Sequence, residues 1–359
     1  MDELAREYRG RTCFVTGADG FIGSHLVEQL IAFGADVRAF VRATSSGELR
    51  NIGHLRSRLR IHRGNLTDKT SVDAAVRELR GGDRTIVFHL GAQAHVGESW
   101  ERPYDTIASN ILGTLNLLQA IVDSGIVIYK FDMAGTSEEY GNVHPEMKDY
   151  YRYAPDGSLI LNENSPVNPK SIYATSKIAG DFLTMNYADA YGLPGVTTRM
   201  FNNYGPRQNP RYVTGTVITQ ALSRPAIEIG YTRAKRDFCY VADGVLGHLS
   251  VALLGNPGEV YVYGQGHNVT IKEWIDLILE VGRREGYWAE KEIVAEKRRF
   301  RPGTSDVEEL RVDYDKLNAL SRWRPRVSWE EGISRTIRWY AEHRDVWIGR
   351  VDWQDEPPR

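Results

Sequence analysis

Cysteine is scarce in this chain, and so are long hydrophobic stretches and any excess of charge. Cys13 and Cys239 are the only two cysteines among 359 residues, and they stand far apart in apolar segments. They cannot form a disulfide framework or a cysteine metal cluster, so we expect no bound metal and a reducing, cytoplasmic environment. No apolar run approaches the length needed to cross a bilayer, and we therefore expect no membrane anchor or secretion signal.

The charge of the chain is almost balanced. The 45 Lys and Arg residues face 47 Asp and Glu residues, which gives a formal net charge of −2. Proteins that bind nucleic acid usually carry a positive excess, so we expect neither nucleic acid nor an acidic membrane surface as a partner. The 42% of hydrophobic residues is ordinary for a globular protein with a substantial core.

Short apolar strands alternate with amphipathic helices in the first part of the chain. Strands are expected at 12–16, 35–41, 59–66, 85–92 and 126–135, and helices at 21–34, 70–80 and 107–123. This alternation predicts an α/β fold, a Rossmann-type doubly wound parallel sheet with ligands at the carboxyl ends of its strands. Further on, loops rich in Pro, Gly and Arg separate helical stretches at 213–224, 270–284 and 328–343, which predicts a smaller C-terminal α/β lobe.

These patterns suggest domain boundaries. We expect residues 1–200 to form a dinucleotide-binding domain, joined by 238–256. Residues 201–237 and 257–345 should form the substrate-binding lobe, and 346–359 a tail whose last residues, WQDEPPR, are disordered.

A glycine-rich turn follows the first expected strand. In TGADGFIG, Gly17, Gly20 and Gly23 recur at spacings of three, directly before the first helix. Such glycines allow a tight turn, close approach of the backbone to a pyrophosphate, and close packing of the helix on the strand. The glycine spacing alone is not specific, but its position between an expected strand and an expected helix predicts dinucleotide binding.

The end of the second strand bears on the choice between NAD and NADP. An acidic residue there would bind the free ribose 2′-hydroxyl of NAD, and the sequence VRATSS offers none. Arg42 suits a 2′-phosphate, which favours NADP over NAD, although a solvated surface arginine is the alternative interpretation.

Tyr173 and Lys177 stand four residues apart in SIYATSK, on one face of an expected helix after the fifth strand. A cationic lysine beside a phenol favours the phenolate, so this pair is a candidate base. The pairs Tyr231 with Lys235 and Tyr287 with Lys291 have the same spacing but are expected on the surface. Directly after the fifth strand, TSEEYG supplies Thr136 as a hydrogen-bonding group and Glu138 as a carboxylate. We expect Glu139 to be a solvated loop charge.

The motifs TGADGFIG, TSEEYG and YATSK together resemble those of the extended short-chain dehydrogenase/reductase superfamily. Within it, the stretches at 41–55, 90–103 and 298–310 are similar to GDP-mannose 4,6-dehydratase and related nucleotide-sugar dehydratases. The resemblance implies Thr136, Glu138, Tyr173 and Lys177 as the catalytic set. It implies cofactor contacts at Gly17, Gly20, Phe21, Ile22, Gly23, Arg42, Asn65, Leu66, Leu90, Ala92, Tyr173 and Lys177, and substrate contacts at Ser137, Asn202, Arg207, Arg236 and Arg301.

The chain departs from the family pattern in two places. Asn65 stands where relatives usually carry aspartate, and the stretch 142–172 is longer than expected and rich in Tyr and charge. The stretch 202–217 also resembles dehydratases acting on other nucleotide sugars, so GDP-mannose and UDP-N-acetylglucosamine both stay open as substrate types.

The resulting hypothesis is an NDP-hexose 4,6-dehydratase that forms an NDP-4-keto-6-deoxyhexose by internal hydride transfer from C4 to C6. Tyr173 would take the C4 hydroxyl proton, and Glu138 would remove the C5 proton once C4 is a ketone. A nucleotide-sugar decarboxylase or 4-epimerase is the alternative within the superfamily, and a non-catalytic nucleotide-binding regulator is the alternative outside it. An apolar helix at 107–123 could form half of a dimer interface, and the resemblance implies a homodimer or homotetramer.

Overall fold

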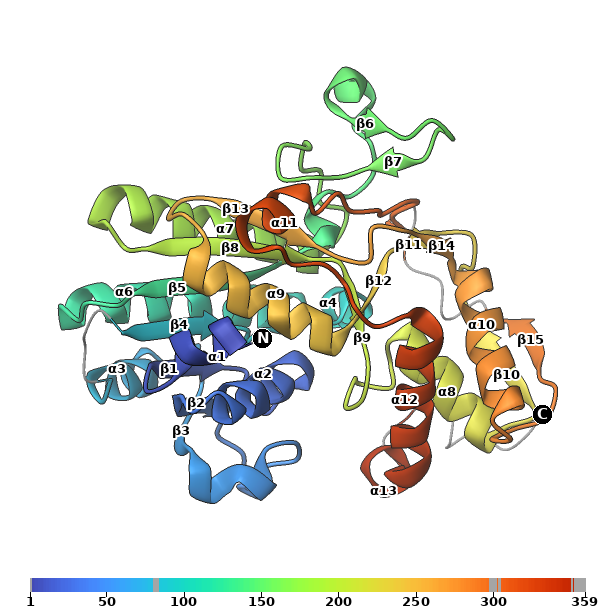
Figure 1. The fold of residues 1–359 in the computed structure, drawn as a ribbon, viewed down its shortest axis with the longest axis horizontal. Helices are drawn as coiled ribbons and strands as arrows, with labels where there is room; N and C mark the ends of the chain where they lie inside the picture. The colour runs from blue at the N-terminus through green and yellow to red at the C-terminus, as the bar shows by residue number, and fades with distance from the viewer. Residues whose placement is uncertain (1, 80–83, 297–301, 303–304, 350, 352–359) are drawn as a thin grey trace.

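The computed structural model describes residues 2–79, 84–296, 302, 305–349 and 351. Within these residues a seven-stranded sheet has the order β13-β8-β5-β4-β1-β2-β3, and all of its neighbouring strands pair in parallel (Figure 1). Its strands are β1 (Thr12–Thr16), β2 (Asp36–Arg42), β3 (Arg60–Gly64), β4 (Thr85–His89), β5 (Lys130–Thr136), β8 (Gly195–Met200) and β13 (Val260–Tyr263). The strand order reverses between β1 and β4, so the prediction of a doubly wound Rossmann-type sheet is confirmed.

Helices cover both faces of this sheet (Figure 1). Side chains of β1 alternate between the faces, Cys13 and Val15 joining one core cluster and Phe14 the other. The first face is covered by α1 (Asp2–Tyr8), α2 (Phe21–Ala32) and α9 (Val241–Leu254). The second face is covered by α3 (Lys69–Arg77), α6 (Gly113–Ser124) and α7 (Ile172–Tyr191).

The smaller lobe has its own core, rich in aromatic side chains. Phe238 and Trp274 stack with ring centroids 4.0 Å apart, and Tyr204 packs edge-on against both. The helices around them are α8 (Val213–Ser223), α10 (Ile271–Arg284), α12 (Trp329–Glu342) and α13 (Arg344–Trp347). Paired short strands complete the lobe: β9 (Asn202–Tyr204) with β12 (Phe238–Tyr240), β10 (Ala226–Ile229) with β15 (Glu292–Ala295), and β11 (Lys235–Arg236) with β14 (Val269–Thr270).

The boundary between the lobes differs from the one expected. Strand β13 lies within the range 257–345 assigned to the smaller lobe, yet it pairs with β8 at the edge of the large sheet. Helix α11 (Asp315–Ser321) packs against β13 and α9, so it too accompanies the large sheet. The four residues of β13 are apolar and buried, which fits a strand of a covered parallel sheet. Their sequence does not indicate the strand with which β13 pairs.

The long segment after β5 forms an arm at the top of Figure 1. It contains η3 (Ser137–Glu139), η4 (Pro145–Tyr150) and a hairpin of β6 (Arg152–Tyr153) and β7 (Leu159–Ile160). Backbone hydrogen bonds join Leu161 to Arg311 and Asp313, and the Asn142 side chain binds the backbone of Asp306 and Glu308. The arm therefore packs on the late segment of the smaller lobe.

The apolar helix expected at 107–123 is observed as three joined pieces. These are α5 (Pro103–Ile107), a π-helical turn η2 (Ala108–Leu112) and α6, preceded by α4 (Val96–Glu101). The one-residue widening of a π-turn often marks a functional site. At the other end of the chain, Trp347 and Val351 are buried in the core of the smaller lobe, whereas the segment 353–359 expected to be disordered lies outside the described residues.

No helix in the described part of the chain combines the length and the apolar character needed to span a membrane.

Candidate active site

In the glycine turn between β1 and α2, the backbone at Gly17 and Gly23 is packed too closely for a side chain. A Cβ on Gly17, whose φ is +67°, would lie 2.9 Å from the backbone of Gly91, and a Cβ on Gly23 would lie 2.2 Å from the Gly17 carbonyl oxygen. The N-cap of α2 is Gly20, which offers no side chain to the first amides of the helix. These free amides at a helix N-terminus suit a pyrophosphate, so the turn fits a dinucleotide cofactor.

The other expected cofactor residues lie at the same edge of the sheet. Asn65 and Leu66 follow β3, and Leu90 and Ala92 follow β4. A Cβ on Gly91 would lie 2.7 Å from Leu66, which shows how closely these strand ends approach one another. The strand order reverses between β1 and β4. Dinucleotide cofactors bind in the crevice at such a reversal, outside the carboxyl ends of the parallel strands.

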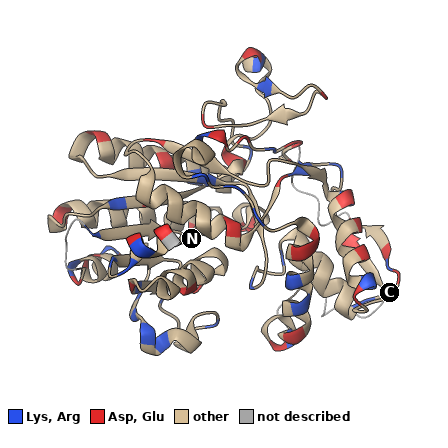
Figure 2. Ribbon diagram, in the orientation of Figure 1, with Lys and Arg blue, Asp and Glu red and all other residues tan. Residues whose placement is uncertain are grey.

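Arg42 ends β2, and its side chain is exposed. It opens the connection 43–59, which contains η1 (Gly53–Arg58) and carries several basic residues, visible below α2 in Figure 2. The Asp19 carboxylate in the glycine turn accepts hydrogen bonds from the backbone amides of Arg50, Asn51 and Ile52, at 2.8 to 3.0 Å. The turn thereby holds this basic connection beside the dinucleotide site.

The segment TSEEYG turns sharply at the end of β5. Thr136 is the last residue of the strand and the N-cap of η3, and its hydroxyl accepts a hydrogen bond from the Glu138 amide at 3.4 Å. Ser137 and Glu138 are both buried, 2% and 7% exposed. A carboxylate at this position is enclosed with its neighbours and is not a freely solvated charge.

Helix α7 brings Tyr173 and Lys177 to the same place. Ser171 caps the helix by accepting a hydrogen bond from the Ala174 amide at 3.0 Å, and Gly192 ends it in a left-handed conformation. Tyr173 lies in the first turn and Lys177 one turn later, and both are buried. The side chains of Thr136 and Glu138 lie near the Tyr173 phenol, so β5 and α7 bring the residues expected to be catalytic together.

Burial dominates the acidity of this pair. Desolvation raises the pKa of Tyr173 well above its usual range, and the nearby Tyr212 and carboxylates of Glu139 and Glu138 add to that effect, while the Thr136 hydrogen bond opposes it. Desolvation lowers the pKa of Lys177, and Asp181 and Glu139 counteract the change. The direction for Tyr173 is opposite to the one expected for a phenol beside a lysine, because the cost of burying a phenolate is the largest contribution in the chain without its cofactor.

The expectation for Glu139 is wrong. This side chain is fully buried, its Oε2 lies 2.8 Å from Arg199 Nε, and its Oε1 accepts a hydrogen bond from the Thr136 amide at 2.8 Å. Asp181 Oδ2 approaches the same Arg199 Nε at 2.9 Å. A buried arginine supplied by β8 compensates the charge, and nothing in the local sequence around Glu139 indicates that partner.

A chain of hydrogen bonds connects the glycine turn with helix α7. Thr16 Oγ1 lies 2.8 Å from His89 Nδ1, and His89 Nε2 lies 3.0 Å from Thr114 Oγ1. Burial, together with the charge of Lys177, lowers the pKa of His89 to about 3, which keeps the ring neutral. From the π-turn, Asn110 donates a hydrogen bond to Ser176 Oγ at 2.8 Å.

Asn110 and Tyr212 are parts of the site that sequence reasoning missed. Asn110 also accepts a hydrogen bond from the Gln93 amide and donates one to the Gln93 carbonyl oxygen, so it anchors the loop after β4. The Tyr212 hydroxyl donates to the Ala94 carbonyl oxygen at 2.7 Å, which ties the N-terminus of α8 to the same loop. The π-turn around Asn110 has no simple sequence signal, whereas Tyr212 directly precedes a helix that the sequence does predict.

The expected substrate residues are distributed differently. The buried Asn202 Oδ1 has no hydrogen-bond partner among the described residues, which suits a ligand contact. Arg236 is buried and donates to the Val307 carbonyl oxygen at 2.7 Å, close to the late loop. Arg207 instead binds α2, donating to Glu28 Oε1 at 2.6 Å and Ser24 Oγ at 3.3 Å, and Arg301 lies outside the described residues.

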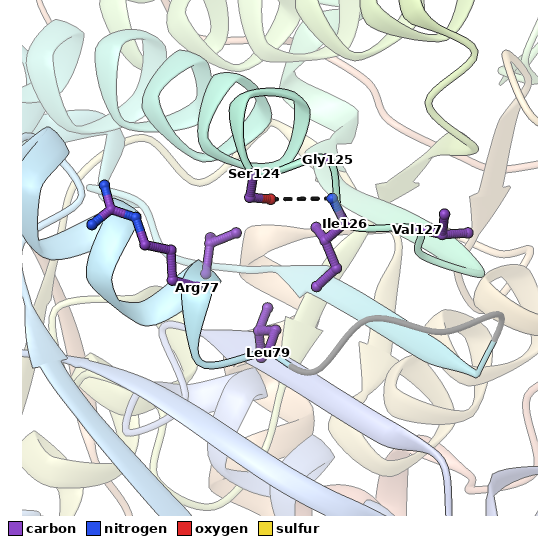
Figure 3. A pocket seen from close by; sticks show the side chains of 7 residues that line it. Arg77, Leu79, Ser124, Gly125, Ile126 and Val127 are labelled. Atoms are coloured by element: carbon purple, nitrogen blue, oxygen red, sulfur yellow. Dashed lines mark hydrogen bonds between the residues drawn. The ribbon is translucent and has the colours of Figure 1, made fainter.

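A surface pocket elsewhere in the fold has no part in this site. Figure 3 shows it between the C-terminal ends of α3 and α6, with Arg77, Leu79 and Ile126 among the residues that line it. It lies where β4 and β5 begin, at the amino ends of the strands, whereas the residues expected to be catalytic follow the carboxyl ends.

Comparison with known proteins agrees with this geometry. The family model described as GDP-mannose 4,6 dehydratase matches residues 14–336. GDP-mannose 4,6 dehydratase 1 of Arabidopsis thaliana is 29% identical over 349 residues, covering 91% of this chain and 89% of its own length.

Solved structures extend the similarity to the fold. A double mutant of the dTDP-glucose 4,6-dehydratase DesIV of Streptomyces venezuelae, solved with NAD bound, is 30% identical, has a TM-score of 0.79, and matches over 94% of this chain and 99% of its own. RMD of Pseudomonas aeruginosa, complexed with NADPH, is 26% identical with a TM-score of 0.71, over 95% and 100% of the two chains. The chain therefore belongs to the GDP-mannose 4,6-dehydratase family of nicotinamide-dependent lyases.

Proposed function

We propose that this chain removes water across C5 and C6 of a nucleotide-diphosphate hexose, of the GDP-mannose or UDP-N-acetylglucosamine type, and releases a 4-keto-6-deoxy sugar. The observation that carries the proposal is a buried carboxylate, Glu138, enclosed with the Tyr173–Lys177 pair at the carboxyl end of β5. A hydrogen at C5 becomes acidic only while C4 is a ketone, so an oxidising pair and a separate base are both required.

The residues divide the reaction between them. Tyr173 takes the C4 hydroxyl proton, Thr136 orients that hydroxyl, and Lys177 stabilises the charge on the phenol oxygen. The glycine turn at Gly17, Gly20 and Gly23 would hold the nicotinamide dinucleotide, which would supply reversible hydride transfer between C4 and C6. Glu138 takes the C5 proton and passes it to the C6 hydroxyl, which leaves as water. A proton from Tyr173 then replaces the one lost at C5, so protons and hydrides balance.

A panel of nucleotide sugars tests this function. Purified protein is incubated with NADP or NAD and with GDP-mannose, UDP-N-acetylglucosamine, dTDP-glucose or UDP-glucuronate, and the products are weighed by mass spectrometry. Loss of one water with a 4-keto product from one of the hexoses is the expected result. Loss of CO2 from the uronate would indicate a decarboxylase, and a stereoisomer of unchanged mass would indicate an epimerase. Bound cofactor with no product would indicate a regulator.

We further propose that the cofactor is NADP, recognised through Arg42. No carboxylate pairs with this exposed guanidinium in the described part of the chain, so it is available for a 2′-phosphate. Replacing Arg42 by alanine should weaken NADP binding by about 10- to 100-fold, because a charge-assisted hydrogen bond of about 1.5–3 kcal/mol is lost. The affinity for NAD should stay within about twofold of wild type.

The measurement for Arg42 is a titration of each cofactor by calorimetry. Arg58→Ala, which removes another exposed arginine from the same connection, serves as the control and should affect neither cofactor. Equal losses for NAD and NADP in the Arg42 variant would contradict the 2′-phosphate assignment.

We also propose that two copies of the chain associate through the α5, η2 and α7 helices, which pack against one another. Large apolar side chains are exposed there: Tyr104 (87%), Ile107 (39%), Leu112 (44%) and Phe182 (51%). An apolar surface of this kind is rare on a monomer, and a second copy is the commonest partner. Converting Tyr104 and Ile107 to glutamate should halve the mass measured by light scattering, whereas Val127→Glu, at another exposed apolar position, should not. A wild-type chain of monomer mass would refute the association.

A further inference from the structure

Four ionisable side chains lie buried together behind the catalytic residues: Lys177 and Asp181 on α7, Glu139 in η3 and Arg199 on β8. Lys177 and Asp181 stand one helical turn apart, on one face of α7. Glu139 and Asp181 are both fully buried, and a carboxylate oxygen of each lies within 2.9 Å of Arg199 Nε. The cluster therefore contains two potential cations and two potential anions.

The numbers of acidic and basic groups in this cluster bear on the role of Glu139. Asp181 alone is sufficient to neutralise Arg199, so a second buried carboxylate would be costly without another cation. Lys177 is that cation: its burial lowers its pKa, and the negative charges of Asp181 and Glu139 act against the loss of its proton. Burial and Asp181 also raise the pKa of Glu139 itself, so these groups titrate as a coupled set.

Glu139 has a second connection, to the turn that carries the catalytic carboxylate. Its Oε1 accepts the Thr136 backbone amide, and its own carbonyl oxygen accepts the Asn168 amide at 3.0 Å. The Glu139 side chain thus ties the first residue of the segment 136–139 to the last and links the segment through Arg199 to β8, while the Glu139 backbone joins it to Asn168. A shift of this segment would move Thr136 and Glu138 together.

We propose that Glu139 is a positioning residue of the active site, which holds the turn of Thr136 and Glu138 against α7 and places a second carboxyl group beside Arg199. The inference rests on the proposed dehydration for its kinetic test and on the geometry alone for its structural test. Glu139 itself touches neither sugar nor cofactor in this assignment.

Two variants separate the hydrogen bond from the charge. Glu139→Gln keeps an acceptor for the Thr136 amide but removes the charge, and Glu139→Leu removes both. We expect the single-turnover rate of C4 oxidation, followed at 340 nm, to fall about 10-fold in the first variant and about 100-fold in the second, because small misplacements of reacting groups have effects of this size. KM for the nucleotide sugar should stay within about twofold, since ground-state binding is unchanged.

Asp132→Asn provides the matched control. Asp132 is also a fully buried carboxylate, on β5, but its hydrogen-bond partners are His248 and Thr198. It is therefore not part of the cluster that contains Lys177. This variant should lower the melting temperature and leave the C4 oxidation rate near wild type. Hydrogen exchange of the peptide spanning 136–140 adds a readout without substrate: it should accelerate in Glu139→Leu and stay slow in Glu139→Gln and Asp132→Asn.

The outcomes are distinct. A Glu139→Leu variant with wild-type oxidation rate and slow exchange would overturn the inference, and so would a rate loss no larger than that of Asp132→Asn. If the wild-type chain oxidises no sugar of the panel, the proposed function fails, and the exchange measurement still decides whether Glu139 holds the turn.

Discussion

Replacing Glu138 by glutamine is expected to leave oxidation at C4 largely intact while water loss falls about 1,000-fold. The amide fills the same buried space beside Thr136 and Tyr173 but cannot accept the C5 proton. A positioned acid–base group contributes about 10²–10⁴-fold to a rate, and Ser137 offers no second carboxylate to compensate. Reduced cofactor should therefore accumulate, and this is visible at 340 nm.

A second measurement isolates the proton transfer of Glu138. In D2O the wild-type enzyme should introduce deuterium at C5 of the product, and Glu138→Gln should yield no detectable exchange at C5 of the bound sugar. Glu146→Gln, the same substitution at an exposed site in η4, serves as the control and should behave as wild type. Full dehydration by the Glu138 variant would refute the role assigned to this carboxylate.

Removing the Tyr173 hydroxyl should stop the reaction one step earlier. In Tyr173→Phe we expect C4 oxidation to slow about 1,000-fold or more, because the variant lacks the phenol that we assign to take the C4 hydroxyl proton. The buried ring fills the same space, so the melting temperature should change little. Stopped-flow absorbance at 340 nm measures the step directly.

Tyr287→Phe is the matched control for this substitution. Tyr287 stands four residues before Lys291, as Tyr173 does before Lys177, but it follows α10 in a turn of the smaller lobe. Because Tyr287 and Lys291 have the same spacing but do not lie on a helix, Tyr287→Phe should have wild-type kinetics. If Tyr173→Phe retained more than about a tenth of the wild-type oxidation rate, a different base would have to be sought.

Helix positions and the glycine turn could be predicted because each depends on residues that are close together in the sequence. Apolar periodicity placed α8, α10 and α12 to within two residues at each end, and the glycine spacing located the turn at Gly17. Ser171 and Gly192, a good N-cap and a left-handed C-cap, bound α7 and so fix Tyr173 and Lys177 on one face.

Features that depend on partners distant in sequence were not predictable in this way. Glu139 was expected in solvent because its partner, Arg199, is 60 residues away and arrives on another strand. The contact of the Arg207 guanidinium with Glu28, far earlier in the chain, also had no local signal. The position of Asp181 beside Lys177 could have been predicted locally, because the two residues are four apart and therefore lie on one face of a helix.

The late position of β13 in the chain has a consequence for biosynthesis. Until residues 260–263 have left the ribosome, β8 is the outermost strand of the nascent sheet, with unpaired amides and carbonyl groups along one side. An open strand of this kind invites pairing with other chains. The order in which this chain is made therefore leaves one edge of the large sheet unpaired until much of the smaller lobe has also been synthesised.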